Sequence, residues 1–254
     1  YDNARFVGNV GWRQDEQTFD GTKLDYGVGD FKLSAAYLTQ VNGITPGFDA
    51  NVTNNLFNAS WTGAPGGSLT AYGYLLETDN VPDSDNDTWG LRYAGAFDLD
   101  AFKLLLTLEG AQQEVEAGDT EYYFAELGAE MAGVTVKLAQ EVLGSDDGVV
   151  AFQTPLATKH AFNGWADLFL ATPADGLEDT FVTVGGKLAG FKLAAIYHDF
   201  KSNEGSTDYG TEMDLLVARP IGKHYTVGLK YADYSADDFG ADTSKYWAWG
   251  ELKF

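Results

Sequence analysis

The sequence has no cysteine, few basic residues and no long apolar run, and each absence excludes a class of protein. Without cysteine the chain has neither a disulfide framework nor thiol catalysis, which suits a protein that crosses an oxidising compartment. Its 16 lysines and arginines are outnumbered by 38 acids, and the net charge of −22 argues against nucleic acid as a partner. A run of about 18 apolar residues, which a membrane-spanning helix needs, does not occur.

What the chain does contain favours many strands joined by turns. Its 254 residues include 30 glycines, and aromatic residues make up 14 % of them. Apolar and polar residues alternate with period two from end to end, which is typical of strands whose two faces have different surroundings. We expect about fourteen strands, near residues 4–14, 19–28, 31–37, 52–62, 68–78, 88–97, 101–113, 121–131, 134–143, 180–188, 191–201, 208–218, 225–235 and 245–254.

The final stretch, 245–254, alternates aromatic and aliphatic residues with charges and ends on Phe254. In a soluble protein such a terminal strand would be an edge open to aggregation, whereas a closed barrel in a bilayer has no edge. A terminal aromatic residue on the lipid face also resembles the C-terminal signal by which the barrel assembly machinery recognises bacterial outer-membrane proteins. The alternative is the last strand of an ordinary soluble β-protein.

The connections between the expected strands are of two kinds. Short ones carry Gly, Asp or Pro and fit hairpin turns, as at 29–30 and 132–133, whereas long ones are acidic and polar, as at 80–87 and 236–242. Short turns on one side and long loops on the other are the asymmetry of outer-membrane barrels, and strands of about ten residues match a tilted crossing. The predicted fold class is therefore all-β, a transmembrane antiparallel up-and-down β-barrel formed by residues 1–254 as a single domain.

The stretch 144–178 breaks the alternation, and treating it as one long loop leaves an even number of strands. Asn163 near its centre can cap a short helix over 164–170, which ends before Pro173. We expect this extracellular loop to fold inward and narrow a pore; a flap on the surface is the alternative. The predicted constriction residues are Phe152, His160, Asn163, Trp165 and Asp167.

The same alternation sorts the charges, because eleven of the 16 lysines and arginines fall on the face opposite the apolar one. Such side chains cost roughly 2–4 kcal/mol each against lipid near the midplane, so this face should line a water-filled lumen. Basic residues there lower the barrier for anions, and aromatic residues such as Tyr72, Tyr74 and Phe124 offer sugar rings a stacking surface. Alternatively, the lumen charges pair with one another and only hold the barrel's shape. The predicted pore-lining residues are Arg5, Arg13, Lys23, Lys32, Arg92, Lys103, Glu109, Glu126, Lys137, Lys192 and Lys230.

Two stretches carry a family resemblance. The opening YDNARFVGNVGWRQ of 1–14 with EQTFD of 16–20, and AFQTPLAT of 151–158 with FNGWAD of 162–167, are similar to bacterial porins of the alginate-export type. The resemblance runs over the whole chain and implies an outer-membrane barrel, typically of about eighteen strands, whose basic lumen passes an anionic polysaccharide or other small anionic solutes. If the family's strand number applies, the resemblance implies that about four further N-terminal strands belong to the barrel, and the lumen here is less purely basic than the family's.

An acidic loop has the spacing that opens a calcium site. Asp83, Asp85 and Asp87 fit, but Thr88 stands where glycine is needed and Ala94 where the bidentate glutamate belongs. A solvated acidic loop, able to hold divalent ions that bridge lipopolysaccharide phosphates, explains these residues better.

The sequence predicts no metal, no cofactor and no catalytic site. His160, His198 and His224 are too far apart in sequence for an obvious zinc set, and no nucleophile elbow or His-Glu-x-x-His motif occurs. The predicted function is a porin for passive diffusion of small hydrophilic solutes, anionic or saccharide, in the bacterial outer membrane, among lipid and lipopolysaccharide. A barrel-embedded hydrolase that uses His198 and a soluble carbohydrate-binding β-protein are the alternatives.

Overall fold

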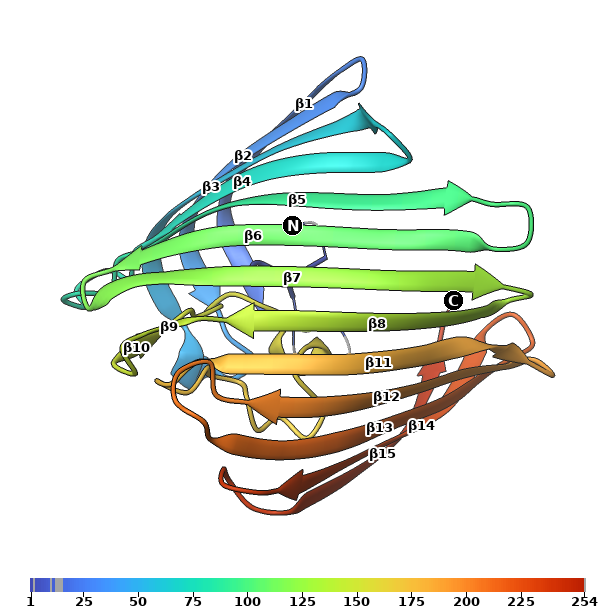
Figure 1. Ribbon diagram of the computed structural model, residues 1–254. Coiled ribbons are helices and arrows are strands. Elements are labelled where there is room, and N and C mark those ends of the chain that lie inside the picture. Colours follow the sequence, from blue (N-terminus) through green and yellow to red (C-terminus); the bar gives the residue numbers. More distant parts are fainter. Residues whose placement is uncertain (2, 10, 12–15, 254) are drawn as a thin grey trace.

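The computed structural model describes residues 1, 3–9, 11 and 16–253. Thirteen strands form one sheet in chain order, and each pairs with the next through an antiparallel ladder (Figure 1). The elements are β1 (Thr18–Val28), β2 (Phe31–Asn42), η1 (Pro46–Phe48), β3 (Ala50–Ala64), β4 (Gly67–Leu76), β5 (Asn86–Asp98), β6 (Lys103–Val115), β7 (Gly118–Met131), β8 (Val134–Leu143), β9 (Ser145–Asp146), β10 (Val150–Ala151), η2 (Lys159–Ala161), β11 (Leu177–Leu188), β12 (Phe191–Lys201), β13 (Asp208–Ile221), β14 (Tyr225–Ala236) and β15 (Thr243–Leu252). No helix in these described residues is long and apolar enough to cross a membrane.

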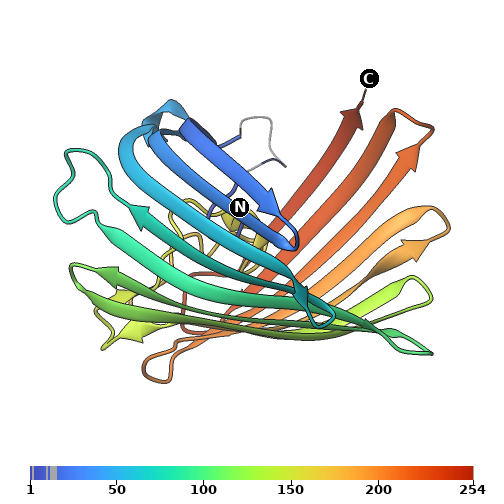
Figure 2. The same ribbon diagram turned by 90° about the horizontal axis from the view of Figure 1, so that it is seen from above.

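The sheet curls strongly about its strand direction, and Figure 2 shows it from above as a trough with β1 and β15 at its two edges. The all-β antiparallel architecture is confirmed. Between residues 16 and 253 no ladder joins β1 to β15, so the closed ring of the prediction is not formed between these two strands.

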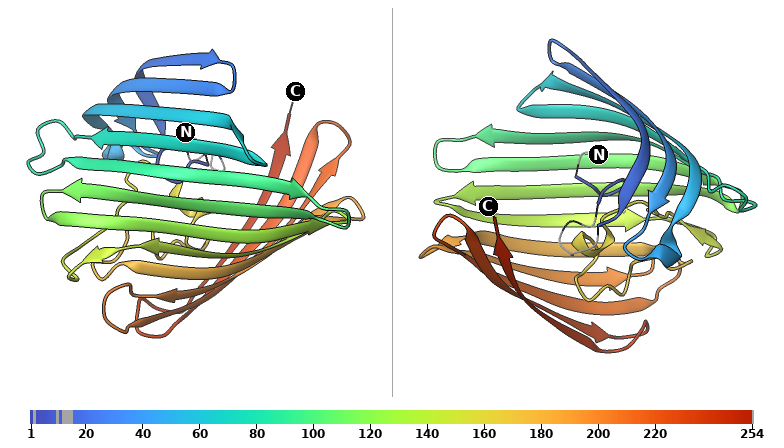
Figure 3. Two further views of the ribbon diagram at one scale, coloured as in Figure 1. Left: turned by 45° about the horizontal axis from the view of Figure 1, so that its top comes forward. Right: turned by 180° about the vertical axis from the view of Figure 1, so that it is seen from behind.

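The expected first strand, 4–14, is wrong. Residues 3–9 lie on the concave side of the trough (Figure 3), and Val7 makes an isolated bridge with Leu156 of the long loop. Arg5 and Phe6 each contact both the wall and the long loop, so neighbouring residues of this stretch are buried together and do not alternate between two faces. The described sheet therefore has thirteen strands where about fourteen were expected. The expected strand also included Val10, Trp12 and Arg13, which lie outside the described residues.

The two faces of the sheet differ as the alternation predicts. On β6, Thr107 and Glu109 are buried on the concave face, whereas Leu108 between them is 48 % exposed on the convex one. On β14, Leu229 is 61 % exposed, next to the inward-facing Lys230. So large an exposed apolar surface marks a membrane or partner contact in a folded protein. Exposed members of this convex band include Leu24, Tyr26, Leu33, Phe57, Leu91, Leu127, Leu138, Val182, Val217 and Tyr246.

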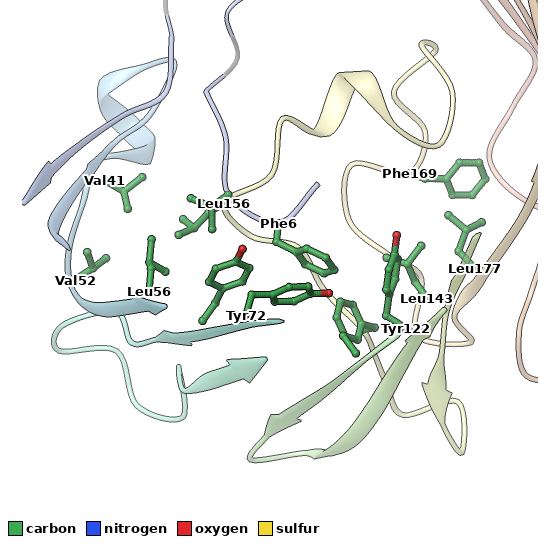
Figure 4. Packing of buried hydrophobic residues seen from close by; sticks show 14 of the residues in the cluster. Phe6, Val41, Val52, Leu56, Tyr72, Tyr122, Leu143, Leu156, Phe169 and Leu177 are labelled. Carbon is green, nitrogen blue, oxygen red and sulfur yellow. The ribbon is translucent and has the colours of Figure 1, made fainter. Parts of the chain in front are cut away.

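The buried core lies inside the trough, between its concave face and the segments folded against it. Figure 4 shows Phe6 between Tyr72 of β4 and Tyr122 of β7, with ring centroids 5.2 Å away in both cases. Phe152 of the long loop packs on the same ring at 5.8 Å. The residues that narrow the trough are therefore held by apolar burial, which is the largest favourable term in packing.

The long connection between β8 and β11 runs on the concave side (Figure 3) and contains β9, β10 and η2. The helix expected over 164–170 is wrong, because this stretch consists of turns and bends. Asn163, Gly164 and Asp167 have φ values of 53°, 83° and 60°, and such left-handed residues interrupt a right-handed helix. The helical turn η2 lies earlier, at Lys159–Ala161.

Candidate functional site

Arg5 joins the N-terminal segment, the long loop and the wall of the trough. Its Nε donates to Glu141 Oε1 of β8 at 2.6 Å, Nη2 to Asn163 Oδ1 at 2.9 Å, and Nη1 to Thr154 Oγ1 at 3.4 Å. Its guanidinium also lies over the Phe162 ring at 4.8 Å, and the residue is only 2 % exposed. A buried charge with its donors satisfied braces the parts that it touches. In this structure Arg5 holds the loop in place, and its contact with passing solute stays a prediction.

Asn163 belongs to the same network and does not act as a helix cap. Its amide donates to Glu141 Oε2 at 2.7 Å and to Asp179 Oδ2 of β11 at 3.3 Å. The Tyr122 hydroxyl donates to Glu141 Oε1 at 2.7 Å. An amide with both donors and acceptors serves two carboxylates and a guanidinium at once, which explains why Asn163 faces the wall.

Two carboxylates of β13 accept hydrogen bonds from the backbone of the loop tip. Trp165 N donates to Asp214 Oδ2 at 3.1 Å, and Ala166 N donates to Glu212 Oε1 at 2.7 Å. Gly164 passes so close that a Cβ there would lie 2.4 Å from Glu212 Oε2, and its φ of 83° also favours glycine. The tip therefore depends on glycine at this position.

A second polar group ties the loop to the strands near the C-terminus. His160 Nδ1 lies 2.6 Å from Asp167 Oδ1, and Lys245 Nζ donates to Asp167 Oδ2 at 3.1 Å. Lys230 Nζ lies 3.0 Å from His160 Nε2 and 3.9 Å from the centre of the Trp165 ring. Burial alone would raise the pKa of Asp167, but the hydrogen bonds and charges of His160 and Lys245 lower it below its ordinary value.

Further charged residues of the concave face pair across neighbouring strands. Arg92 of β5 is hydrogen-bonded to Glu109 of β6, which also accepts from the Tyr72 hydroxyl at 2.8 Å. Lys137 Nζ donates to Glu126 Oε1 at 3.0 Å. The alternative weighed from the sequence, that interior charges pair with one another, describes these residues well.

Of the remaining predicted lining residues, Lys32, Lys103 and Lys192 lie next to short turns, whereas Lys23 lies in the middle of β1. Lys23 Nζ lies 3.0 Å from Asp25 Oδ2. Lys103 Nζ lies 3.6 Å from Asp98 Oδ1, and the Lys103 side chain is partly exposed. Lys32 and Lys192 are exposed as well, and Arg13 lies outside the described residues. The structure thus brings Arg92, Glu126, Lys137 and Lys230 beside the loop, with Glu109 paired to Arg92, and leaves Lys32, Lys103 and Lys192 at the rim and Lys23 in the middle of β1.

Two hollows border the constriction formed by the loop and residues 3–9. One, of about 510 Å³, opens between β2–β5 and the loop, and Lys159, His160 and Gln153 contribute polar groups to it. Burial lowers the pKa of the Lys159 ammonium, and the charge of Arg5 lowers it further. The other, of about 300 Å³, lies between the loop tip and the wall around Phe124.

Sequence reasoning missed several members of this network, among them Asp179 and Lys245. Asp179 fell between the loop expected at 144–178 and the strand expected at 180–188, yet it belongs to β11, which begins at Leu177. Lys245 lies two residues before Trp247 on β15, on the same face of the strand, so the alternation could have predicted that it points inward. Within the described ranges, no group of three or more His, Cys, Asp or Glu side chains is arranged to hold a metal ion.

No protein-family model and no curated protein matches the sequence. Solved structures match through the fold: OccAB4 of Acinetobacter baumannii has a TM-score of 0.77 at 12 % identity, over 98 % of this chain and 68 % of that one. OccK11 (OpdR) of Pseudomonas aeruginosa has a TM-score of 0.72 at 17 % identity, over 98 % of this chain and 74 % of that one. OpdQ of Pseudomonas aeruginosa has a TM-score of 0.74 at 13 % identity, over 98 % of this chain and 75 % of that one.

These neighbours are outer-membrane porins of the Occ/OprD type. They support the porin part of the resemblance and do not point to the alginate-export type in particular. Identities this low speak for architecture alone, and on that ground the chain has the fold of an outer-membrane porin.

Proposed function

We propose that the chain forms the wall and constriction of a passive diffusion channel for small hydrophilic solutes in the bacterial outer membrane. The observation that carries the proposal is the contrast between the two faces of the sheet. The convex face exposes aliphatic and aromatic side chains, whereas the concave face holds the charged ones around an inward-folded loop. In a bilayer this arrangement satisfies both faces.

In this proposal the convex band contacts lipid and lipopolysaccharide, and the barrel assembly machinery inserts the chain. The loop between β8 and β11, with residues 3–9, sets the width of the path, and the lining residues named from the sequence meet the solute. Anionic and saccharide solutes both fit the proposal: lysines at the short-turn rim favour the first, and aromatic residues of the concave face favour the second.

Recordings in planar bilayers test the channel. The purified protein should give stepwise conductance, and a salt gradient should reveal through the reversal potential whether anions pass more readily than cations. Absence of conductance steps from folded, detergent-solubilised protein would reject the proposal.

The hydrolase alternative finds no support around His198. Its Nδ1 lies 2.9 Å from Asp179 Oδ1, as in a catalytic dyad, but its Nε2 lies 3.7 Å from Asp214 Oδ2. Both ring nitrogens thus face carboxylates, whereas a hydrolase needs a hydroxyl or thiol nucleophile on one of them. His198 is 4 % exposed and serves as a link between β11, β12 and β13.

A further inference from the structure

The hollow of about 300 Å³ beside the loop tip differs from its surroundings in chemistry. It is lined by five aromatic residues, Tyr122, Phe124, Phe162, Trp165 and Phe181, and by polar side chains that include Arg92, Glu126 and Lys137. Its volume is at the small end of the range for ligand sites, about 300–1,000 Å³. We call this hollow the aromatic chamber.

The charges of the aromatic chamber are already compensated. Lys137 is bonded to Glu126 at 3.0 Å, and Arg92 is paired with Glu109 directly behind the chamber wall. Glu141, which also borders the chamber, is neutralised by Arg5. An entering anion would find no spare positive charge here, and it would have to displace a carboxylate from its partner.

Paired charges of this kind suit hydroxyl groups instead. A hydroxyl donates one hydrogen bond and accepts others, so it can bridge the ammonium of Lys137 and the carboxylate of Glu126 without breaking their balance. The half-buried Arg92 offers further donors next to the same wall. A solute that carries several hydroxyls and no charge therefore matches the polar half of the chamber.

The aromatic half supplies a flat apolar surface. The rings of Phe124 and Phe181 lie 6.4 Å apart at an angle of 32°, on β7 and β11, the two strands that flank β8. The Arg92 guanidinium lies 6.0 Å from the centre of the Phe124 ring, so a hydrogen-bond donor and an apolar ring surface lie next to each other here. Aromatic faces gain from covering flat apolar ring surface, such as the C–H face of a pyranose.

We infer that the aromatic chamber binds an uncharged pyranose unit, with Phe124 as stacking platform and the Lys137–Glu126 pair as hydroxyl partner. This inference rests on the proposed function only in that solute must reach the chamber through the pore. Binding itself can be measured on the detergent-solubilised protein whether or not current flows.

Glucose and glucuronate make a sharp pair of probes, because they differ only in the carboxylate. Isothermal titration of the intact protein should give saturable heat with glucose and at least about tenfold weaker binding of glucuronate. Phe124→Ala should weaken glucose binding about tenfold, whereas Leu127→Ala, on the opposite face of the same strand, should bind like the unchanged protein. Lys137→Gln, which keeps a donor but unbalances Glu126, should also weaken it.

Three results overturn the inference: no glucose binding by folded protein, tighter binding of glucuronate than of glucose, or equal glucose binding before and after Phe124→Ala. If Phe124→Ala fails to fold, the comparison of the two sugars on the unchanged protein still decides. Conductance steps without glucose binding would reject the chamber and leave the channel standing. Glucose binding without conductance would reject the channel and keep the chamber.

Discussion

Arg5 is the residue on which three separate parts of the molecule meet. Period-two alternation would place Arg5 and Phe6 on opposite faces, but both are buried in the structure because residues 3–9 form no strand. The partners Glu141, Asn163 and Thr154 lie 136 to 158 residues away in sequence. Contacts between residues so far apart in sequence depend on the path of the loop, and the period-two pattern does not predict that path.

Arg5→Met should destabilise the protein strongly. The substitution leaves Glu141 buried at 3 % exposure without its cation, and breaking a buried pair in this way costs roughly 3–5 kcal/mol. Urea unfolding in detergent should show the loss, and single-channel traces should become noisier as the loop loosens.

The matched control for Arg5 is Lys23→Met, which removes a lysine whose partner Asp25 is exposed. Pairs in contact with water contribute little, so this variant should unfold at the same urea concentration as the unchanged protein. Equal stability of both variants would contradict the bracing role of Arg5.

At the scale of elements, the strands were largely predictable and the interior segments were not. Twelve of the expected strands after 4–14 coincide with β1–β8 and β11–β14 within a few residues, and the last matches β15, since period-two alternation is a local property. The stretch 164–170 has a helical composition, but the carboxylates of β13 and the left-handed residues around it decide its course. Tertiary contacts overrode local preference there.

The attachment of the loop through Asp167 should depend on pH. Because the folded pKa of Asp167 is lowered, its carboxylate stabilises the loop above the ordinary value of 3.8 and loses this contribution as pH falls through the lower folded value. Channel recordings should therefore show more frequent openings and closings below pH about 4 than at pH 6.

Asp167→Asn isolates this effect, since it removes the titrating group while keeping the size of the side chain. The variant should be noisy already at pH 6 and change less on acidification. If it retained the full acid response of the unchanged protein, another carboxylate would be responsible.

For the whole molecule, the decisive property is that apolar residues face outward. The composition alone conceals this, because an overall net charge of −22 does not show that aliphatic and aromatic side chains occupy most of the outward face of the strands. The two-sided pattern was predictable from the sequence. The open arrangement of the sheet edges was not, because the count rested on a first strand that does not form.

A charge on the convex face should therefore block insertion. Leu108→Arg places a cation among exposed apolar side chains of β6. Near the bilayer midplane this should make the free energy of folding into lipid vesicles less favourable by roughly 2–4 kcal/mol. Leu105→Arg, on the concave face of the same strand, should fold nearly as well as the unchanged protein. Gel-shift assays of folding report both, and equal folding of the two variants would indicate that the convex face does not meet hydrocarbon.

Thirteen strands linked only by antiparallel ladders have a geometric consequence. Counting along the sheet, β1 and β15 run in the same direction. A ring sealed directly by these two strands would contain one parallel seam, whereas a ring of antiparallel pairs alone requires an even number of strands.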